Sequence, residues 1–231
     1  MVRVEPIANS AWAEARWLVI APHPDDETLG AGALIATQAA AGRLAAVVFL
    51  TDGAASHTHP DAASRERLIA LRRDEARQAL SVLCDRAPPE ILFLDWPDAQ
   101  TDAVDERVMR RDAGRLVDLC DARGVTAMAV TALHEPHCDH AAAARLARAV
   151  AVAAVRPPVL FEYLVWATTP PPGARLAIRT EAVPPARRTR ALDQHRSQLT
   201  DLMGPGFRLD TARRDMPATD DLYLVESMDA S

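Results

Sequence analysis

The sequence predicts an α/β fold in which helices cover both faces of a mostly parallel sheet. Apolar runs of strand length alternate along the chain with segments of helical periodicity, which is typical of this class. The chain has 231 residues, 49% of them hydrophobic. A chain of this length can bury a core without staples, so we expect residues 1–231 to form a single domain.

The first elements follow one another in a regular order. WLVIAP (17–22) is an apolar run typical of a buried strand, and a helix is expected over 30–41. LAAVVFLTDG (44–53) predicts a second strand that ends in the turn-forming pair Asp-Gly. An amphipathic helix over 64–84 is expected to use Ser64 as its N-terminal cap.

The same alternation continues to residue 167. ILFLD (91–95) predicts a third strand, and the helix expected over 102–123 ends at Gly124, a residue type that commonly terminates helices. A fourth strand over 126–133, a helix over 139–155 and a fifth strand over 159–167 complete this part.

The last part of the chain has a weaker pattern. TTPPPG (168–173) predicts a stiff loop, and LAIRTEAV (176–183) predicts a further strand. A helix that starts with a proline is expected over 185–203, and LYLVES (222–227) predicts a last strand.

Composition excludes several classes of function. The formal net charge is −6 and no basic stripe is present, so we expect no nucleic-acid binding. The chain contains no lysine, which excludes a Schiff-base lysine and a Walker-type phosphate loop. Gly30 and Gly32 lack the third glycine of a dinucleotide-binding loop, because Ile35 stands in its place, so we expect no NAD site.

Targeting signals and cysteines indicate the compartment. The amino terminus lacks the apolar core of a signal peptide, and the apolar stretch over 141–155 is too short to span a bilayer. Cys84, Cys120 and Cys138 are scattered and odd in number, which fits a reducing compartment better than a disulfide framework. We therefore expect no transmembrane segment and a cytoplasmic location.

Two clusters of ionisable residues follow expected strands. APHPDDETLG (21–30) follows the first strand, and HEPHCDH (134–140) follows the fourth. In open α/β sheets, ligands bind at the carboxyl ends of the strands, and the commonest doubly wound order makes the first and fourth strands neighbours. We expect the two clusters to meet at one edge of the sheet.

The spacing within the clusters favours a metal site. His23 and Asp26 are three residues apart across a proline turn, and His137 and His140 are three apart at a helix start. Two imidazoles and one carboxylate around an open position are typical of catalytic zinc. An additional carboxylate could accept a proton from water beside the metal. The alternative is structural: acids at positions 25–27 also favour a helix N-terminus.

These residues resemble a known family. PHPDDE (22–27) and HCDH (137–140), supported by TDG (51–53), LRRDEA (71–76) and HRSQ (195–198), are similar to motifs of the PIG-L/LmbE-like zinc-dependent N-deacetylases. That family deacetylates N-acetylglucosaminyl-phosphatidylinositol and the sugar precursors of mycothiol and bacillithiol. The resemblance implies a Rossmann-like three-layer sandwich.

The resemblance also implies roles for individual residues. It places the zinc ion, which Fe²⁺ could replace in the cell, on His23, Asp26 and His140. It implies that Asp25 is the general base, and that His137 stabilises the oxyanion and protonates the leaving amine. Asp139 could orient His137 by accepting its ring N–H, or could cap the helix.

Substrate contacts are less specific in the sequence. The implied substrate is an N-acetylated sugar or glycoconjugate, and a homo-oligomer is compatible with the sequence. Arg72, Arg73, His134 and His57 are candidate substrate contacts, with solvated surface residues as the alternative. The HRSQ segment is expected to border the pocket, and Glu27 is expected to hold a ligand or the turn by hydrogen bonds. Trp96, Trp166 and Tyr163 could stack on a sugar or pack in the core.

Three other functions fit parts of the pattern. A hydratase of the same fold family would keep the metal and the base. A non-heme iron oxygenase also uses two histidines and a carboxylate, but such enzymes commonly have β-barrel folds and no use for Asp25. A metal-stabilised binding module without catalysis would not need every catalytic position to be filled.

Overall fold

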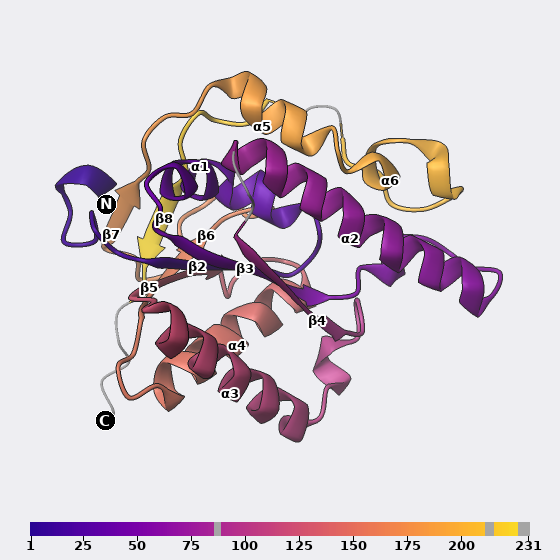
Figure 1. Ribbon diagram of the computed structural model, residues 1–231, viewed down its shortest axis with the longest axis horizontal. Coiled ribbons are helices and arrows are strands. Elements are labelled where there is room, and N and C mark those ends of the chain that lie inside the picture. The colour runs from indigo at the N-terminus through magenta and orange to yellow at the C-terminus, as the bar shows by residue number, and fades with distance from the viewer. Residues whose placement is uncertain (86–88, 211–214, 226–231) are drawn as a thin grey trace.

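The computed structural model describes residues 1–85, 89–210 and 215–225, and its strands form one eight-stranded sheet (Figure 1). The strands are β1 (Arg3–Pro6), β2 (Trp17–Ala21), β3 (Leu44–Thr51), β4 (Glu90–Trp96), β5 (Ala127–Thr131), β6 (Val159–Tyr163), β7 (Leu176–Arg179) and β8 (Asp221–Leu224). Their order across the sheet is β1-β7-β8-β6-β5-β2-β3-β4. Only β8 is antiparallel to its neighbours within the described residues, so the expected mostly parallel sheet is confirmed.

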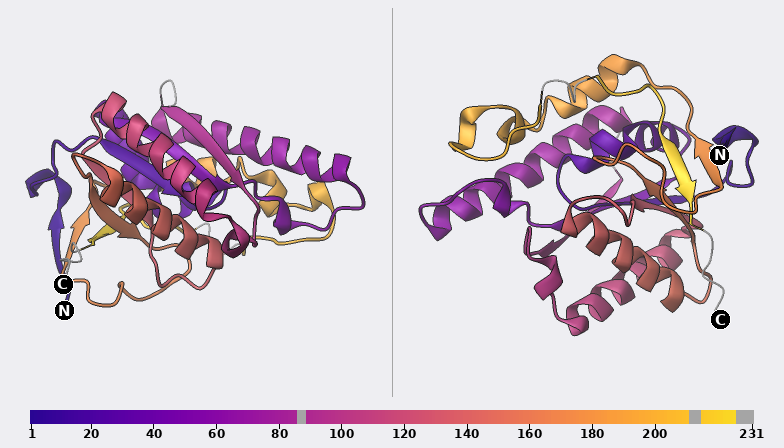
Figure 2. Two further views of the ribbon diagram at one scale, coloured as in Figure 1. Left: turned by 90° about the horizontal axis from the view of Figure 1, so that it is seen from below. Right: turned by 180° about the vertical axis from the view of Figure 1, so that it is seen from behind.

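Helices cover both faces of the sheet (Figures 1 and 2). The helices are α1 (Asp26–Ala40), α2 (Ala62–Cys84), α3 (Glu106–Arg123), α4 (Cys138–Ala153), α5 (Pro185–Leu192) and α6 (Arg196–Leu199). Figure 1 shows α1, α2 and α5 on one face and α3 with α4 on the other. The three-layer α/β sandwich that the sequence predicts is therefore confirmed. Within the described ranges, no helix combines the length and apolarity needed to cross a membrane.

Strand β2 lies at the centre of both hydrophobic cores. All five of its residues are buried. Because side chains alternate along a strand, Trp17 and Val19 pack with the core beneath α1 and α2, and Leu18 and Ile20 pack with the core beneath α3 and α4. Burial on both faces explains why the sequence of this strand is uninterruptedly apolar.

The sheet register brings the two ionisable clusters together. Strand β2 pairs with β5 in parallel, with Trp17 opposite Ala127 and Ile20 opposite Val130. The strands therefore end at the same edge, where His23 follows β2 and His137 follows β5. The expected neighbourhood of the first and fourth predicted strands, which are β2 and β5, is confirmed.

Several element boundaries differ from the sequence expectation. Helix α1 begins at Asp26 rather than at residue 30, because acidic residues form its first turn. Helix α2 is capped by Asp61, whose side chain accepts the Ser64 N–H at 2.7 Å, and not by Ser64. Helix α3 begins at Glu106, and Gly124 ends it with a φ of 64° as expected.

The ends of the chain differ more. Strand β1 was not predicted, because its segment RVEP is short and mostly exposed. The helix expected over 185–203 is broken, because α5 ends at Leu192 and α6 begins at Arg196. The fifth and sixth predicted strands are shorter than expected, and residues 226–227 of the last one lie outside the described residues.

Gly30 sets how closely α1 approaches the sheet. A Cβ atom at this position would meet the Tyr163 ring and would lie 2.8 Å from the Leu164 carbonyl oxygen. The absence of a side chain at Gly30 therefore permits close packing of α1 against the sheet. Gly114 is also helical, but it is exposed and a Cβ there would meet no atom of the described chain within 4 Å.

We expect opposite effects on stability when each of these glycines is replaced by alanine. Gly30→Ala should lower the free energy of unfolding by about 1–3 kcal/mol, because it overpacks the contact with β6. Gly114→Ala should raise it by up to about 1 kcal/mol, because alanine favours a helix. Urea unfolding of both variants measures this. Equal or inverted effects would contradict the packing argument.

Candidate metal centre

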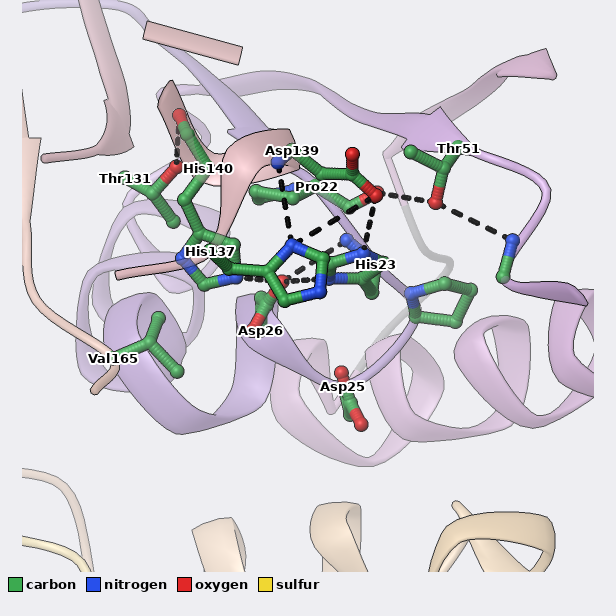
Figure 3. A network of polar contacts seen from close by, with 12 residues as sticks. Pro22, His23, Asp25, Asp26, Thr51, Thr131, His137, Asp139, His140 and Val165 are labelled. Atoms are coloured by element: carbon green, nitrogen blue, oxygen red, sulfur yellow. Dashed lines mark hydrogen bonds and ion pairs between the residues drawn. The ribbon is translucent and has the colours of Figure 1, made fainter. Parts of the chain in front are cut away.

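Three ligand atoms converge at the end of β2 (Figure 3). The Nδ1 atom of His23 lies 3.0 Å from Oδ2 of Asp26. The Nε2 atom of His140 lies 3.3 Å from the same oxygen. The three ligand atoms lie within 4.8 Å of one another. Two imidazoles and one carboxylate with an open fourth position match a catalytic zinc site.

The burial of His140 supports this fit. Its side chain is fully buried, and neither ring nitrogen has a hydrogen-bond partner among the described residues. Buried polar atoms are rarely left in this state, so a metal ion at Nε2 would supply the partner. The other nitrogen, Nδ1, faces Glu135 at 3.4 Å, a contact that fixes the orientation of a ligating ring.

The charges of the centre are complementary. Burial alone would raise the pKa of Asp26, but His140 and His23 hold the pKa of this carboxyl well below its usual range. Burial opposes protonation of His140, yet Asp26 and Glu135 raise its pKa to about 9. The carboxylate is therefore ionised and ready to neutralise a cation.

A second set of ligand atoms, on His23, His137 and Asp139, fits a metal less well. The Asp139 carboxylate already accepts the Ala99 N–H at 2.8 Å and the Thr101 hydroxyl at 2.7 Å. Its Oδ2 also lies 3.0 Å from Nε2 of His23. These contacts use the oxygens of Asp139 to orient the His23 ring, whose Nδ1 then faces Asp26.

The expected partnership of Asp139 with His137 takes a different form. Nδ1 of His137 accepts the backbone N–H of Asp139 at 3.3 Å and caps α4. It lies 3.9 Å from the Asp139 carboxylate. Asp139 therefore neither accepts the ring N–H of His137 nor caps the helix, because its carboxylate turns toward His23.

Asp25 is held apart from the three ligand residues. Its backbone has a φ of 140°, a value that non-glycine residues rarely adopt. Its side chain makes no capping hydrogen bond to the described part of α1, so a helix cap does not explain it. It lies 3.6 Å from the Arg72 guanidinium. Burial raises the pKa of Asp25 to about 7 against the opposing charge of Arg72, which suits a group that exchanges protons near neutrality.

These groups line one cavity of about 470 Å³. Its lining contains six ionisable residues, His23, Asp25, Asp26, Arg72, Asp98 and His137, together with Ala55, Ser56, Ala99, Pro136, Trp166, Gln198 and Phe207. Burial, and then His23, lower the pKa of His137, so its half-buried imidazole is neutral near pH 7. A mixed polar and apolar lining is typical of small-molecule sites.

Among the four candidate substrate contacts, Arg72 is the one that lines the cavity, and its buried guanidinium also binds the carbonyls of Gly53 and Pro24. The Arg73 side chain pairs with Asp95 outside the cavity. His134 contacts the Thr169 carbonyl, and His57 contacts the Arg208 guanidinium at 2.7 Å.

The aromatic candidates also differ in whether they line the cavity. Trp96 and Tyr163 are buried in the interior, whereas Trp166 lines the cavity and packs edge-on against Phe207. Core packing is therefore the role of the first two, and only Trp166 can meet a ligand in this cavity.

Two side chains that contact the candidate metal centre were missed from the sequence. Asp98 lies 3.2 Å from Nε2 of His23 and lines the cavity. Glu135 contacts His140 and accepts the N–H groups of Val165, Trp166 and Ala167. Both follow strands at the active edge of the sheet, and that position was the available signal.

The sequence of the chain matches a known protein family over more than half of its length. Residues 18–151 match the PIG-L family model, described as GlcNAc-PI de-N-acetylase. No curated protein matches the chain in sequence.

Solved structures share the fold. The zinc-inhibited form of teicoplanin deacetylase Orf2 has a TM-score of 0.68 at 20% identity and covers 94% of this chain and 100% of its own. N,N'-diacetylchitobiose deacetylase from Pyrococcus horikoshii, with its inhibitor MPG, has a TM-score of 0.65 at 20% identity over 84% of this chain and 75% of its own. The 4-carboxy-2-hydroxymuconate hydratase GalB from Pseudomonas putida KT2440 has a TM-score of 0.54 at 18% identity over 90% and 95%.

We expect His23→Ala and His140→Ala each to lose most of the bound divalent metal, because each removes one of three ligands. Cys138→Ala is the matched control beside the site and should keep its metal, since its thiol contacts Asp139 instead. Elemental analysis of gently purified protein measures the metal content. Full metal content in both histidine variants would contradict the assignment.

Proposed function

Because the chain belongs to the PIG-L family, we propose that it is a zinc-dependent N-deacetylase. The substrate would be an N-acetylglucosamine-type sugar conjugate, which gives acetate and a free amine. The observation that carries the proposal is the convergence of His23, Asp26 and His140 beside a separately held carboxylate, Asp25. Deacetylases among the fold relatives support the reaction class.

The metal would be held by His23, Asp26 and His140. When bound, zinc supplies a Lewis acid for the amide carbonyl and lowers the pKa of water near it to about 7. The donor set of two imidazoles and one carboxylate also accepts Fe²⁺, so either ion fits the residues present.

Asp25 would act as the general base. It lines the cavity beside His23, and its raised pKa lets it take a proton from the attacking water near pH 7. Arg72, at 3.6 Å, stabilises its ionised form and prevents the burial of an unpaired carboxylate.

His137 would act at the other side of the reacting carbonyl. It lines the cavity, and its ring centroid lies 4.8 Å from that of His23. Nδ1 already accepts a backbone N–H, so Nε2 carries the ring proton and can face the substrate. This N–H can stabilise the developing oxyanion. The proton for the departing nitrogen would come from Asp25, which has taken it from the attacking water, because a neutral imidazole that gave up its only ring proton would become an anion.

A hydratase remains the second candidate, because GalB shares the fold. A screen of N-acetylglucosamine conjugates that follows acetate and free amine separates the two reactions. We expect stoichiometric acetate and amine with zinc-loaded protein and neither product after chelation. Loss of substrate by water addition without acetate would overturn the deacetylase proposal.

The two adjacent aspartates should differ in their effects. Asp25→Asn should keep the metal but lower turnover by roughly 10²–10⁴-fold, because an amide cannot accept the proton. Asparagine has the same shape as aspartate, so the substitution introduces no new steric demand on the strained backbone at this position. Asp26→Ala should instead lose metal, and excess zinc should restore part of its activity.

Bound zinc and acetate release are measured for both variants. The roles would be wrong if Asp25→Asn stayed active or if it, rather than Asp26→Ala, lost the metal.

A further inference from the structure

The HRSQ segment at 195–198 takes part in none of the steps above. His195 precedes α6 and the other three residues form most of that helix, and His195, Ser197 and Gln198 are completely buried. Polar side chains are seldom buried without a specific partner. The partner of His195 lies in the PHPDDE segment, 168 residues earlier in the sequence.

Glu27 connects His195 to the backbone of Asp25. The Nε2 atom of His195 lies 3.0 Å from Oε1 of Glu27, and both side chains are fully buried. The other carboxylate oxygen, Oε2, accepts the Asp25 N–H at 2.8 Å. Nδ1 of His195 has no hydrogen-bond partner among the described residues. The contact with Glu27 is therefore the hydrogen bond that the His195 ring makes through Nε2.

The Asp25 backbone needs such a connection. Its φ of 140° and ψ of −30° lie outside the regions that residues with a Cβ atom normally occupy. A conformation of this kind costs about 1–3 kcal/mol and persists only where neighbouring contacts hold it. At Asp25, the backbone N–H donates to the Glu27 carboxylate, and the backbone carbonyl accepts the N–H groups of Thr28 and Leu29, each at 3.0 Å.

We propose that His195 is a positioning residue for the base, which acts through Glu27 to fix the backbone that aims Asp25 into the cavity. This inference rests on the proposed role of Asp25. Without the ring donor, Glu27 would keep, among the described residues, the Thr28 hydroxyl and the Asp25 N–H as donors. A buried carboxylate with too few donors is unfavourable, so its side chain would be expected to change conformation. The Asp25 backbone would then drift from its strained conformation.

The contact between Ser197 and Glu75 serves as a control for the possibility that the HRSQ segment only anchors the C-terminal part of the chain. Ser197, in the same segment, donates its hydroxyl to Glu75 at 2.6 Å and its N–H at 2.8 Å, which fastens α6 to α2 without involving Glu27. If the segment only anchors the C-terminal part of the chain, loss of either contact should have the same consequence.

The experiment compares His195→Gln, His195→Met and Ser197→Ala in the full-length, zinc-loaded protein. Glutamine places a donor near the Nε2 position, and methionine has similar volume but no donor. Zinc content, kcat, KM and the exchange rate of the Asp25 amide hydrogen are measured for each. The amide exchange is read by NMR without substrate, so it tests the positioning independently of the reaction.

We expect His195→Met to lower kcat by roughly 10- to 100-fold, which is the usual effect of a misplaced reacting group, with little change in KM or zinc content. Its Asp25 amide should exchange faster. His195→Gln should restore most of the wild-type kcat and most of the protection of the Asp25 amide. Ser197→Ala should leave kcat and the amide exchange rate near their wild-type values. His195→Asn, whose amide is too short to reach Glu27, replaces the methionine variant if that variant does not fold.

Three results would overturn the inference. The first is an unchanged Asp25 amide exchange rate and an unchanged kcat in His195→Met. The second is an equal fall in kcat and in amide protection in Ser197→Ala. The third is a fall in kcat that is explained entirely by loss of zinc. If the wild-type protein releases no acetate, the proposed function fails, and the exchange rates alone still decide whether His195 positions Asp25.

Discussion

The structure depends on the burial of three consecutive carboxyl groups at the end of β2. Asp25, Asp26 and Glu27 have exposed fractions of 5%, 1% and 0%. Unpaired buried charge is strongly unfavourable, so each group requires its own partner. Asp26 faces two imidazoles, Asp25 faces Arg72, and Glu27 faces His195. In our proposal, these three chemically similar groups would have three different functions: metal ligand, base and support for the base.

The fold supplies these partners from three directions. The β2–β5 pairing brings in His140, helix α2 brings in Arg72, and the chain between α5 and α6 brings in His195. Glu135 adds a further connection, because it contacts His140 and also binds the backbone that carries Trp166. The segment that carries Trp166 therefore has a fixed position relative to the proposed metal ligands. The parallel sheet provides the common edge, and contacts distant in sequence determine the chemistry there.

Features with a local physical cause could be predicted from the sequence. Buried strands such as β2 are uninterruptedly apolar, and two clusters at the ends of parallel strands indicated the position of the site. Features that depend on tertiary contacts could not be predicted. Helical periodicity continues past Leu192, but the chain turns so that His195 can reach Glu27. The orientation of Asp139 toward His23 was also hidden, because donors from residues 99 and 101 decide it.

Anomalous diffraction from crystals of the zinc-loaded protein tests the central claim most directly, because it locates the ion without reference to activity. The account predicts one strong zinc peak within about 2.0–2.2 Å of the His23 Nδ1, Asp26 and His140 Nε2 ligand atoms. It also predicts that Asp25 lies outside this ligand set while remaining in the cavity. A peak on His137 and Asp139, or a peak with Asp25 as a ligand, would contradict the separation of roles.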